Sequence, residues 1–509
     1  MTADPLPAPP DTRLPHGFTV ELAPDAHRSR DGRLVLGGSP PRVLRLSATA
    51  AGLLGRGRFT VTDRATGTLA RRLLDIGVVH PRPDTGPVRG TTVVIPVRDR
   101  ADLVRQLLTR LAADPQTADL PVLVVDDGSA RPAELAAAVR RYGARLLVHP
   151  RNLGPAAARN TGLRHATTPY VAFLDSDVLP EPGWMAPLLA QFADPSVALA
   201  APRVVSAQAR RQGRLDRYEE VRSPLDMGAR EGPIVPLSAL AYVPSATVVV
   251  RREAVGTGFA PHLRVAEDVD LCMRLHEAGW RLRYVPGSRV GHRHRTDLRN
   301  WLAQRAGYGT GAADLALRHH GQVPPLHAAP WSLAACALAL RGTAAPAAAA
   351  VALTAVTAAR LVRRLPDADT PVRAGTLLTL AGLRGTGEQL LRCATRHHWP
   401  IAVLLGASSR HARRILLAGA LAEGLIDYRR CRPRLNPLEY VLIRRLDDLA
   451  YGWGVWHGAL RRRTAAPLIP RIALSTSTST STPPSTSPST SSARADGPHQ
   501  PSTNLRTPH

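Results

Sequence analysis

Short runs of apolar residues alternate with amphipathic segments between residues 91 and about 300. The runs TTVVIPV, PVLVVDDGS, ARLLVHP and YVAFLDSD have the length and the β-branched content of buried strands. Segments such as RADLVRQLLTRLAA and RPAELAAAVRRYG lie between them and favour helix. Continuous apolar strands separated by helices predict an α/β fold with a parallel sheet that is covered on both faces.

Two of the predicted strands end in acidic clusters. One run ends in DDGS at Asp126, and another ends in DSD at Asp175 and Asp177. Ligands of parallel sheets bind beyond the carboxyl ends of the strands, so we expect both clusters in one crevice. Two carboxylates one residue apart suit a divalent metal shared with substrate phosphates. Asp177 would reach the metal and Asp175 a ribose hydroxyl.

Two further segments carry candidate chemistry. NLGPAAARNTGL places Asn152, Arg159 and Asn160 around a helix start, where they can face an anion. RVAEDVDLCMRLHEAGW predicts a helix over 267–278 with Glu267 and Asp268 in its first turn. Taken singly, each segment also has an ordinary structural explanation: an acidic loop, an Asp-Gly turn, a helix start or a capped helix.

The rest of the chain divides into several parts. Residues 14–80 predict a compact module with strands at FTVEL and RLVLGG, a helix capped by Ser47, and a second helix that ends near Gly77. The flanking segments 1–13 and 474–509 predict disorder, the second because STSTSTSTPPSTSPSTSS cannot bury enough apolar surface to fold.

An Ala- and Leu-rich stretch at 327–427 lies within a predicted helical region, 320–465. Its apolar runs fall short of the ~20 residues of a spanning helix. Two short membrane spans, a membrane-surface hairpin and a buried helical bundle are the alternatives.

Charge and cysteine content limit the classes of partner and the cell compartment that we expect. The net charge is +26 and all the basic residues are Arg, but they are spread along the chain and no nucleic-acid motif accompanies them. We therefore expect no nucleic-acid partner. The four cysteines form no CxxC pair, and the N-terminus has no signal-peptide pattern. We expect a cytoplasmic protein, held at the inner face of the cell membrane if 327–427 attaches there.

The order VVIPVRDR, VVDDGS, NLGPAAARNTGL, FLDSD, AEDVDLCMRLHEAGW and GHRHR resembles that of family-2 glycosyltransferases with the GT-A fold, over residues 90–310. The resemblance implies that Val97 and Asp126 bind the nucleotide base. It implies that the DxD motif binds a divalent metal, Mg²⁺ or Mn²⁺, and the donor diphosphate. The catalytic base would be Asp268. His292 or His294 would complete the metal site. The QxxRW signature of processive synthases is absent, which favours transfer of one or a few sugars.

The segments on either side of residues 90–310 resemble those of the glycosyltransferases of mycofactocin biosynthesis, and residues 14–80 resemble peptide-recognition modules of the PqqD type. This resemblance implies an inverting transfer of glucose from a nucleotide sugar, UDP-glucose, to a peptide-derived redox cofactor, forming a short β-glucan. The partners would be the nucleotide sugar and the peptide-derived acceptor or its precursor peptide. The alternatives are a membrane-associated rhamnosyl or galactosyl transferase for cell-wall glycan, and a non-catalytic peptide-binding scaffold.

Overall fold

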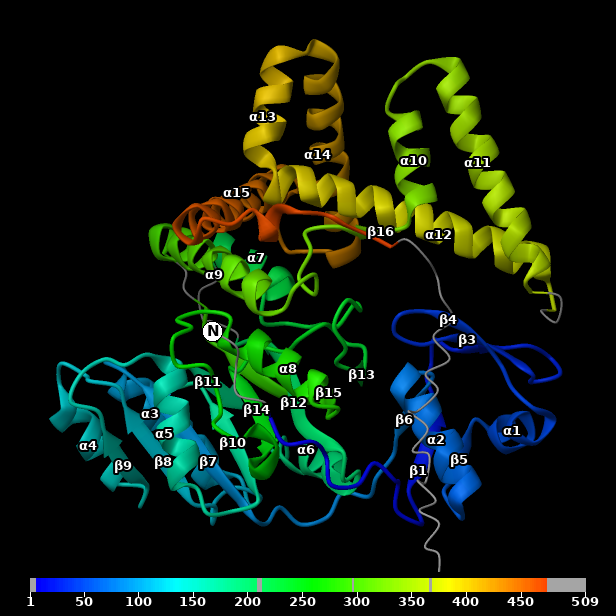
Figure 1. Ribbon diagram of the computed structural model, residues 1–509. Helices are drawn as coiled ribbons and strands as arrows, with labels where there is room; N and C mark the ends of the chain where they lie inside the picture. The colour runs from blue at the N-terminus through cyan, green and yellow to red at the C-terminus, as the bar shows by residue number, and fades with distance from the viewer. Residues whose placement is uncertain (1–5, 208–212, 295–296, 366–368, 474–509) are drawn as a thin grey trace, which may run out of the picture. The chain divides into compact units, whose positions relative to one another are not determined.

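The computed structural model describes residues 6–207, 213–294, 297–365 and 369–473, and the residues up to Ala473 form one compact unit (Figure 1). The predicted disordered tail 474–509 and the first five residues of the predicted loose segment 1–13 lie outside the described residues. From Leu6 onward that segment has no helix or strand. Leu6 nevertheless packs against the core of the central domain, and the carbonyl of Pro7 accepts a hydrogen bond of 2.6 Å from Trp280.

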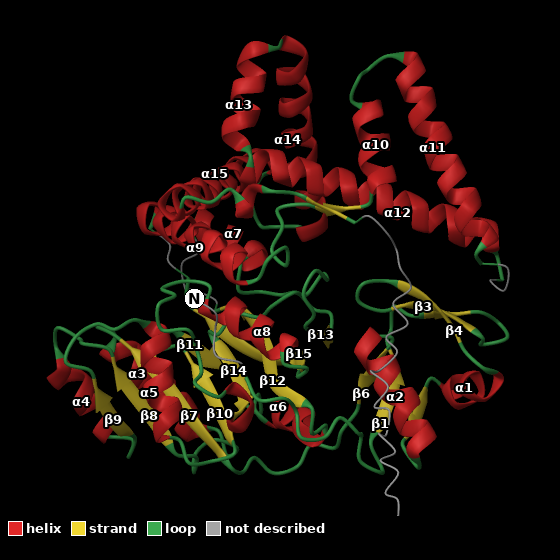
Figure 2. Ribbon diagram, in the orientation of Figure 1, coloured by secondary structure: helices red, strands yellow, loops and turns green. Residues whose placement is uncertain are grey.

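A nine-stranded mixed sheet forms the central domain (Figure 2). The strands are paired in the order β11-β15-β12-β14-β10-β7-β8-β9, and β13 pairs with β15. Their bounds are β7 Thr91–Val97, β8 Val122–Asp126, β9 Arg145–Val148, β10 Tyr170–Leu174, β11 Val178–Pro180, β12 Val197–Ser206, β13 Gly232–Pro233, β14 Thr247–Arg251 and β15 Arg281–His292.

The strands β7 to β10 pair in parallel, as the sequence predicts. The expectation of a wholly parallel sheet is wrong beyond β10, because β14 runs antiparallel to both β10 and β12, and β11 runs antiparallel to β15. A strand that is buried on both faces is a continuous apolar run in either direction, so its sequence does not report its orientation.

Helices cover both faces of this sheet. One face carries α5 and α8, which contribute Leu163 and Leu271 to a core with Phe173. The other face carries α3, α4 and α6. The helix α5 lies so close to β7 that a Cβ at Gly162 would overlap the side chain of Val94. The helix bounds are α3 Ala101–Ala113, α4 Pro132–Arg140, α5 Pro155–His165, α6 Ala186–Ala190, α7 Arg214–Arg222 and α8 Glu267–Glu277.

The N-terminal module has its own core of Phe18, Val20, Val35 and Leu73 with their neighbours. Both predicted helices are present, with Ser47 capping the first and Gly77 ending the second. Two three-stranded sheets, β5-β1-β6 and β2-β3-β4, complete it. The bounds are β1 Thr19–Leu22, β2 His27–Arg28, β3 Leu34–Gly37, β4 Arg42–Arg45, α1 Ala48–Leu53, β5 Arg58–Thr60, α2 Arg64–Ile76 and β6 Val79–Pro81.

The C-terminal region is helical, as predicted. Figure 1 shows α10 and α11 as one hairpin and α13 and α14 as another, both rising from α12. The bounds are α9 Leu298–Arg318, α10 Pro330–Ala339, α11 Ala344–Arg363, α12 Pro371–Arg392, α13 Trp399–Ser408, α14 Arg410–Cys431 and α15 Pro437–Arg462, with a π-helical turn at Cys393–His397 and the short strands β16 His327–Ala328 and β17 Arg471–Ile472. In the described residues α11 is the one helix that is both long and apolar enough to cross a membrane.

Candidate active site

The DDGS segment at the end of β8 holds two carboxylates with different roles. Asp126 is fully buried; one of its oxygens accepts hydrogen bonds from the amide and hydroxyl of Ser129. Its other oxygen is buried without a partner, and this unsatisfied acceptor is free for a ligand donor. Asp127 instead accepts hydrogen bonds from the amides of Leu153 and Gly154, each at 2.8 Å, and thereby shapes the loop before α5.

The DxD segment and the Glu267–Asp268 pair meet through one guanidinium. Arg159 of α5 donates to Asp175 and to Glu267, with both distances 2.7 Å. It is buried and lies over the ring of Phe259. Burial would lower the pKa of Arg159, but the charges of Asp175 and Glu267 outweigh this effect and raise it. A permanently charged Arg159 therefore joins two motifs that are far apart in the sequence.

Asp177 lies beside His292, with 3.4 Å between their nearest oxygen and nitrogen atoms. The two residues are neighbours because β11 and β15 pair with Val178 opposite His292. The second carboxylate oxygen of Asp177 pairs with Arg100. Burial would raise the pKa of Asp177, but the hydrogen bond from His292 and the charges of His292 and Arg100 lower it. Asp177 is therefore ionised.

The other histidine of the pair, His294, has its ring 5.0 Å from that of His292. One of its nitrogens lies 3.4 Å from Glu219. Burial, and then the charges of His292 and Arg305, lower the pKa of His294 to about 3. His294 is therefore neutral.

Asp268 occupies the first turn of α8 and is half-buried. Its carboxylate accepts hydrogen bonds from the amides of Ser245 and Val269. Burial raises its pKa despite these bonds, and burial together with the charge of Asp268 raises the pKa of Glu267 to about 7. The preceding residue, Ala266, has a φ of 64°, a left-handed conformation that is rare outside glycine and is found at functional sites.

The loop before β14 brings the two acidic motifs together a second time. Ser245 donates to Asp268, and the carbonyl of its neighbour Ala246 accepts from the amide of Asp175 at 2.9 Å. Asp175 and Asp268 are thus held on consecutive residues of one segment. The arrangement places Asp268, whose pKa is raised, beside the DxD segment.

The remaining predicted site residues have varied environments. Val97 is buried at the end of β7, paired with Asp126. Asn152 accepts a hydrogen bond of 3.3 Å from Arg264. Asn160 uses both the nitrogen and the oxygen of its side-chain amide on the backbone of Phe259, so it holds that loop in place. Contact of these three residues with a nucleotide sugar stays a prediction.

Sequence reasoning assigned no role to several residues of the site. Arg100 lies within the motif VVIPVRDR, and Glu267 precedes the predicted base, but nothing in either motif indicates the ion pair that the residue makes. Glu219 lies in α7, outside every motif, and pairs with Arg305 of α9 beside His294. Only the folded structure reveals these residues, because their partners come from other helices and strands.

The candidate ligands Asp177 and His292 can hold a divalent metal if the substrate supplies further ligands. In the described part of the chain no group of three or more His, Cys, Asp and Glu residues can hold a metal. Asp177 and His292 provide two candidate ligands. The Nδ1 atom of His292 is buried without a hydrogen-bond partner. Mg²⁺ is commonly held by one or two carboxylates plus substrate phosphates, so this small set is of the expected kind.

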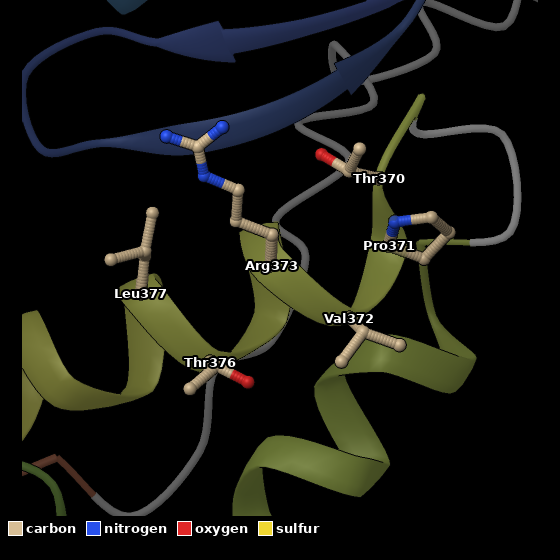
Figure 3. Close-up of a pocket in the computed structure, with 6 residues that line it drawn as sticks. All are labelled: Thr370, Pro371, Val372, Arg373, Thr376 and Leu377. Carbon is tan, nitrogen blue, oxygen red and sulfur yellow. The ribbon is translucent and has the colours of Figure 1, made fainter.

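A hollow of about 570 Å³ lies at the start of α12, away from these residues (Figure 3). It is lined mostly by apolar surface and none of the predicted site residues contributes to it. The lining residues are Thr370, Pro371, Val372, Arg373, Thr376 and Leu377.

Residues 92–256 match the model of the glycosyl transferase family 2. This match spans β7 to β14 and contains the DDGS and DxD motifs, so the mixed sheet is a GT-A glycosyltransferase fold. A solved mannosyltransferase from Pyrobaculum calidifontis, in complex with GDP-Man and Mn²⁺, is 22% identical, covers 60% of this chain and 88% of its own, and superposes with a TM-score of 0.36.

Two relatives illustrate the range of the match. The Pre-mycofactocin glycosyltransferase of Mycobacterium tuberculosis is 44% identical over 472 residues, which are 91% of this chain and 99% of that protein. The Succinoglycan biosynthesis protein ExoU of Rhizobium meliloti is 29% identical over 45% of this chain and 73% of its own length. The first match extends over the N-terminal module and the C-terminal helices as well as the catalytic domain.

Proposed function

The chain belongs to the family of pre-mycofactocin glycosyltransferases and is a family-2 glycosyltransferase, and from this premise we propose that it transfers glucose from UDP-glucose to premycofactocin, building a short β-linked glucan. The observation that carries the proposal is the convergence of the DxD and Glu267–Asp268 motifs on Arg159 and on the Ser245–Ala246 segment. Such a site holds a charged donor on one side and a general base on the other.

The donor side would be built from the strand ends and α5. The free oxygen of Asp126 would accept a hydrogen bond from the nucleotide base, and Asp175 would contact the ribose. Asp177 and His292 would hold a divalent metal, Mg²⁺ or Mn²⁺, which would offset the charge on the departing diphosphate. Arg100 now neutralises Asp177, so it would move aside or toward the diphosphate when the donor binds.

The acceptor side would depend on Asp268. Its carboxylate would remove the proton from the acceptor hydroxyl while that oxygen attacks the anomeric carbon from the face opposite the diphosphate. This displacement inverts the anomeric centre. A positioned base contributes typically ~10²–10⁴-fold to the rate. Its raised pKa makes the carboxylate a stronger base than an exposed aspartate.

We propose further that the N-terminal module binds the acceptor or its precursor peptide. All the residues proposed for the donor lie in the central domain, and the module presents short strands at the edges of two small sheets. An extended peptide can add a strand at such an edge.

The test is a donor and acceptor panel. The full-length protein is incubated with UDP- and GDP-sugars in the presence of premycofactocin, of a cell-wall glycan acceptor or of no acceptor, and nucleotide release and product mass are followed. We expect UDP release with UDP-glucose, stimulated by premycofactocin, and products that grow by hexose units. Turnover only with a cell-wall glycan acceptor would overturn the proposed acceptor, and preference for another sugar would overturn the proposed donor.

A further inference from the structure

The C-terminal helices present an unusually apolar surface. In the described part of the chain nearly all exposed large hydrophobic side chains lie between Leu340 and Ile472. The exceptions are Leu53, Val148, Leu153, Leu298 and Leu317. Contiguous exposed apolar surface of this kind marks a site of interaction with a membrane or another protein.

The helix α15 shows the feature most clearly. Its exposed apolar residues are spaced three, four or seven apart, so they form one stripe along the helix. Trp453, in the middle, is 61% exposed. The stripe consists of Leu438, Leu442, Leu446, Leu449, Trp453 and Leu460.

The opposite side of α15 is buried, and it carries a cluster of charged residues beside apolar ones such as Ile443 and Val455. Arg444 pairs with Glu423 of α14 at 2.9 Å, and Asp448 pairs with Arg396 at 3.1 Å. Asp447 accepts a hydrogen bond from Tyr218. A helix of a water-soluble domain buries its apolar face and exposes its polar one. The helix α15 departs from this pattern, because it buries a cluster of charged residues and exposes a stripe of leucines. This arrangement is expected when apolar material covers the stripe.

The two hairpins have the same character. In α13 the only buried residue is Gly406, and Val403 and Leu404 are among its exposed residues. The apolar window of α11 has a mean hydropathy of 1.6 and is 6% buried. The hollow of Figure 3 adds Val372 and Leu377 of α12 to this exposed surface.

The exposed charges around this surface are almost all positive. Among the described residues from Pro330 to Ala473, the buried acids are Glu423, Asp427, Asp447 and Asp448. Glu388 is paired with Arg430 and Glu439 with Arg214, and the exposed Asp369 binds the backbone of Arg30. The exposed basic residues include Arg341, Arg363, Arg373, Arg410, Arg413 and Arg414. Apolar surface bordered by arginine is complementary to an anionic lipid leaflet.

We propose that α10 to α15 dock the enzyme on an anionic membrane surface, with their apolar faces at the boundary of the acyl chains and the arginines among the headgroup phosphates. On the localisation expected from the sequence, this is the cytoplasmic leaflet. The arrangement keeps the catalytic domain in water and at the membrane.

The helix lengths indicate that the hairpins do not cross the bilayer. A hairpin returns to the side that it left, so the shorter helix limits its depth. Ten residues in α10 and in α13 correspond to about 15 Å, half of the ~30 Å hydrocarbon core. Arg341 and Arg410 lie near the tips, and a guanidinium avoids the bilayer centre. The hairpins therefore stay within the leaflet that they enter.

A second copy of the chain fits this surface less well. Two such surfaces would bring exposed arginines together with few free acids to pair with them, and like charges oppose association. A lipid leaflet supplies the anionic charge that this surface lacks.

Vesicle flotation of the full-length protein tests the proposal. One set of vesicles contains equal parts phosphatidylcholine and phosphatidylglycerol, and the other contains phosphatidylcholine alone. We expect flotation with the anionic vesicles and at least ~10-fold weaker partitioning to the neutral ones. Brominated acyl chains should quench the tryptophan fluorescence, and Trp453→Phe should lose part of this quenching.

Matched double variants locate the surface. Val403→Ser with Leu404→Ser on α13, and Leu442→Ser with Leu460→Ser on α15, should each weaken flotation several-fold without lowering the unfolding temperature, since the side chains are exposed. Leu298→Ser with Leu317→Ser replaces two exposed leucines outside the surface and should float like the wild type. Flotation that is insensitive to both test variants would overturn the proposal. So would a protein that does not float but forms a dimer that these variants dissociate, because the surface would then be covered by a second copy.

Discussion

At the scale of single residues, the site depends on side chains that strand pairing brings together. Asp177 follows β10 and His292 ends β15, and they become neighbours because β11 lies antiparallel to β15. Arg159 reaches Asp175 and Glu267 from a helix that precedes both in the chain. Three predictions follow from the charges of these residues.

Asp177→Asn should abolish metal-dependent sugar transfer and leave the fold intact. The substitution removes the negative charge that a divalent metal needs, while the side chain keeps its shape. Nucleotide release with Mg²⁺ or Mn²⁺ measures the loss, and circular dichroism checks the fold. Asp226→Asn is the control, because Asp226 also pairs with an arginine, Arg203, but outside the site. Near wild-type turnover in Asp177→Asn would show that Asp177 is not a metal ligand.

Asp268→Asn should still bind the nucleotide sugar but turn over at least ~10²-fold more slowly, the low end for a lost general base. Its carboxylate faces the Ser245 amide rather than any predicted donor residue, so donor affinity has no reason to fall. Calorimetric binding of UDP and steady-state kinetics separate the two effects. Loss of UDP binding with unchanged fold would show that Asp268 belongs to the donor side.

Glu267 should make stability depend on pH. Its pKa in the folded protein is raised to about 7 by burial and by Asp268, whereas a glutamate in an unfolded chain titrates near ~4.3. Between these values the folded state retains a proton that the unfolded state has released. The free energy of unfolding therefore falls as pH rises through this window, by roughly 4 kcal/mol at most.

The measurement is urea unfolding at about pH 5 and about pH 8, which together cover most of this window. Glu267→Gln should remove part of the pH dependence, and the raised pKa of Asp268, which has the same sign, should leave a remainder. Glu253→Gln, at a residue whose side chain is 62% exposed, should behave like the wild type. An identical pH dependence in Glu267→Gln would contradict the shift.

At the scale of elements, the crossing of α9 and α15 depends on glycine. A Cβ at Gly309 would overlap the carbonyl oxygen of Tyr451, and one at Gly454 would overlap that of Ala306. The helices can therefore approach until their backbones touch. This contact places Arg305 of α9 between Glu219 and Asp447.

Gly309→Ala should destabilise the protein by about 1–3 kcal/mol, the usual cost of overpacking. Gly307→Ala is the matched control on the same helix, because a Cβ there meets nothing within 4 Å; it should be neutral or stabilising by up to ~1 kcal/mol, since alanine favours helix. Midpoints of denaturant unfolding compare the two. Equal effects would mean that α9 and α15 do not touch at this point.

At the scale of the whole molecule, ion pairs join the N-terminal module to the catalytic domain. Arg71 pairs with Asp194 at 2.6 Å, and Asp75 pairs with Arg281 at 2.9 Å. The module is therefore attached through polar contacts, while its apolar core is its own. A module attached in this way can be removed without opening the catalytic core.

Deleting residues 1–80 should raise the KM for the acceptor and leave slow hydrolysis of the nucleotide sugar largely unchanged, because lost ground-state binding of the acceptor appears in KM. Deleting 1–13 is the control: it removes the contacts of Leu6 and Pro7 with the catalytic domain but keeps the module. If hydrolysis and transfer fall together with solubility, the module is a structural cap.

Much of the fold could be predicted locally. The apolar runs located β7 to β10, and Ser47 and Gly77 marked helix ends correctly, because strand burial and helix caps depend on a few adjacent residues. The antiparallel course of β14 could not be predicted. Nor could the choice among the three alternatives for 327–427, because an apolar helix has one sequence pattern whether it is buried in protein or exposed.

The sequence by itself determined which residues are the candidates for the chemistry. Asp126, Asp175, Asp177 and Asp268 stand in motifs whose order and spacing are legible along the chain. Only the tertiary structure decided what each carboxylate faces: Asp126 keeps one free oxygen, Asp177 meets His292 and Arg100, and Glu267 shares Arg159 with Asp175. The physical reason is that ionisation and ligand binding depend on burial and on charges a few ångströms away. Those charges come from strands and helices that are distant in sequence and adjacent only after folding.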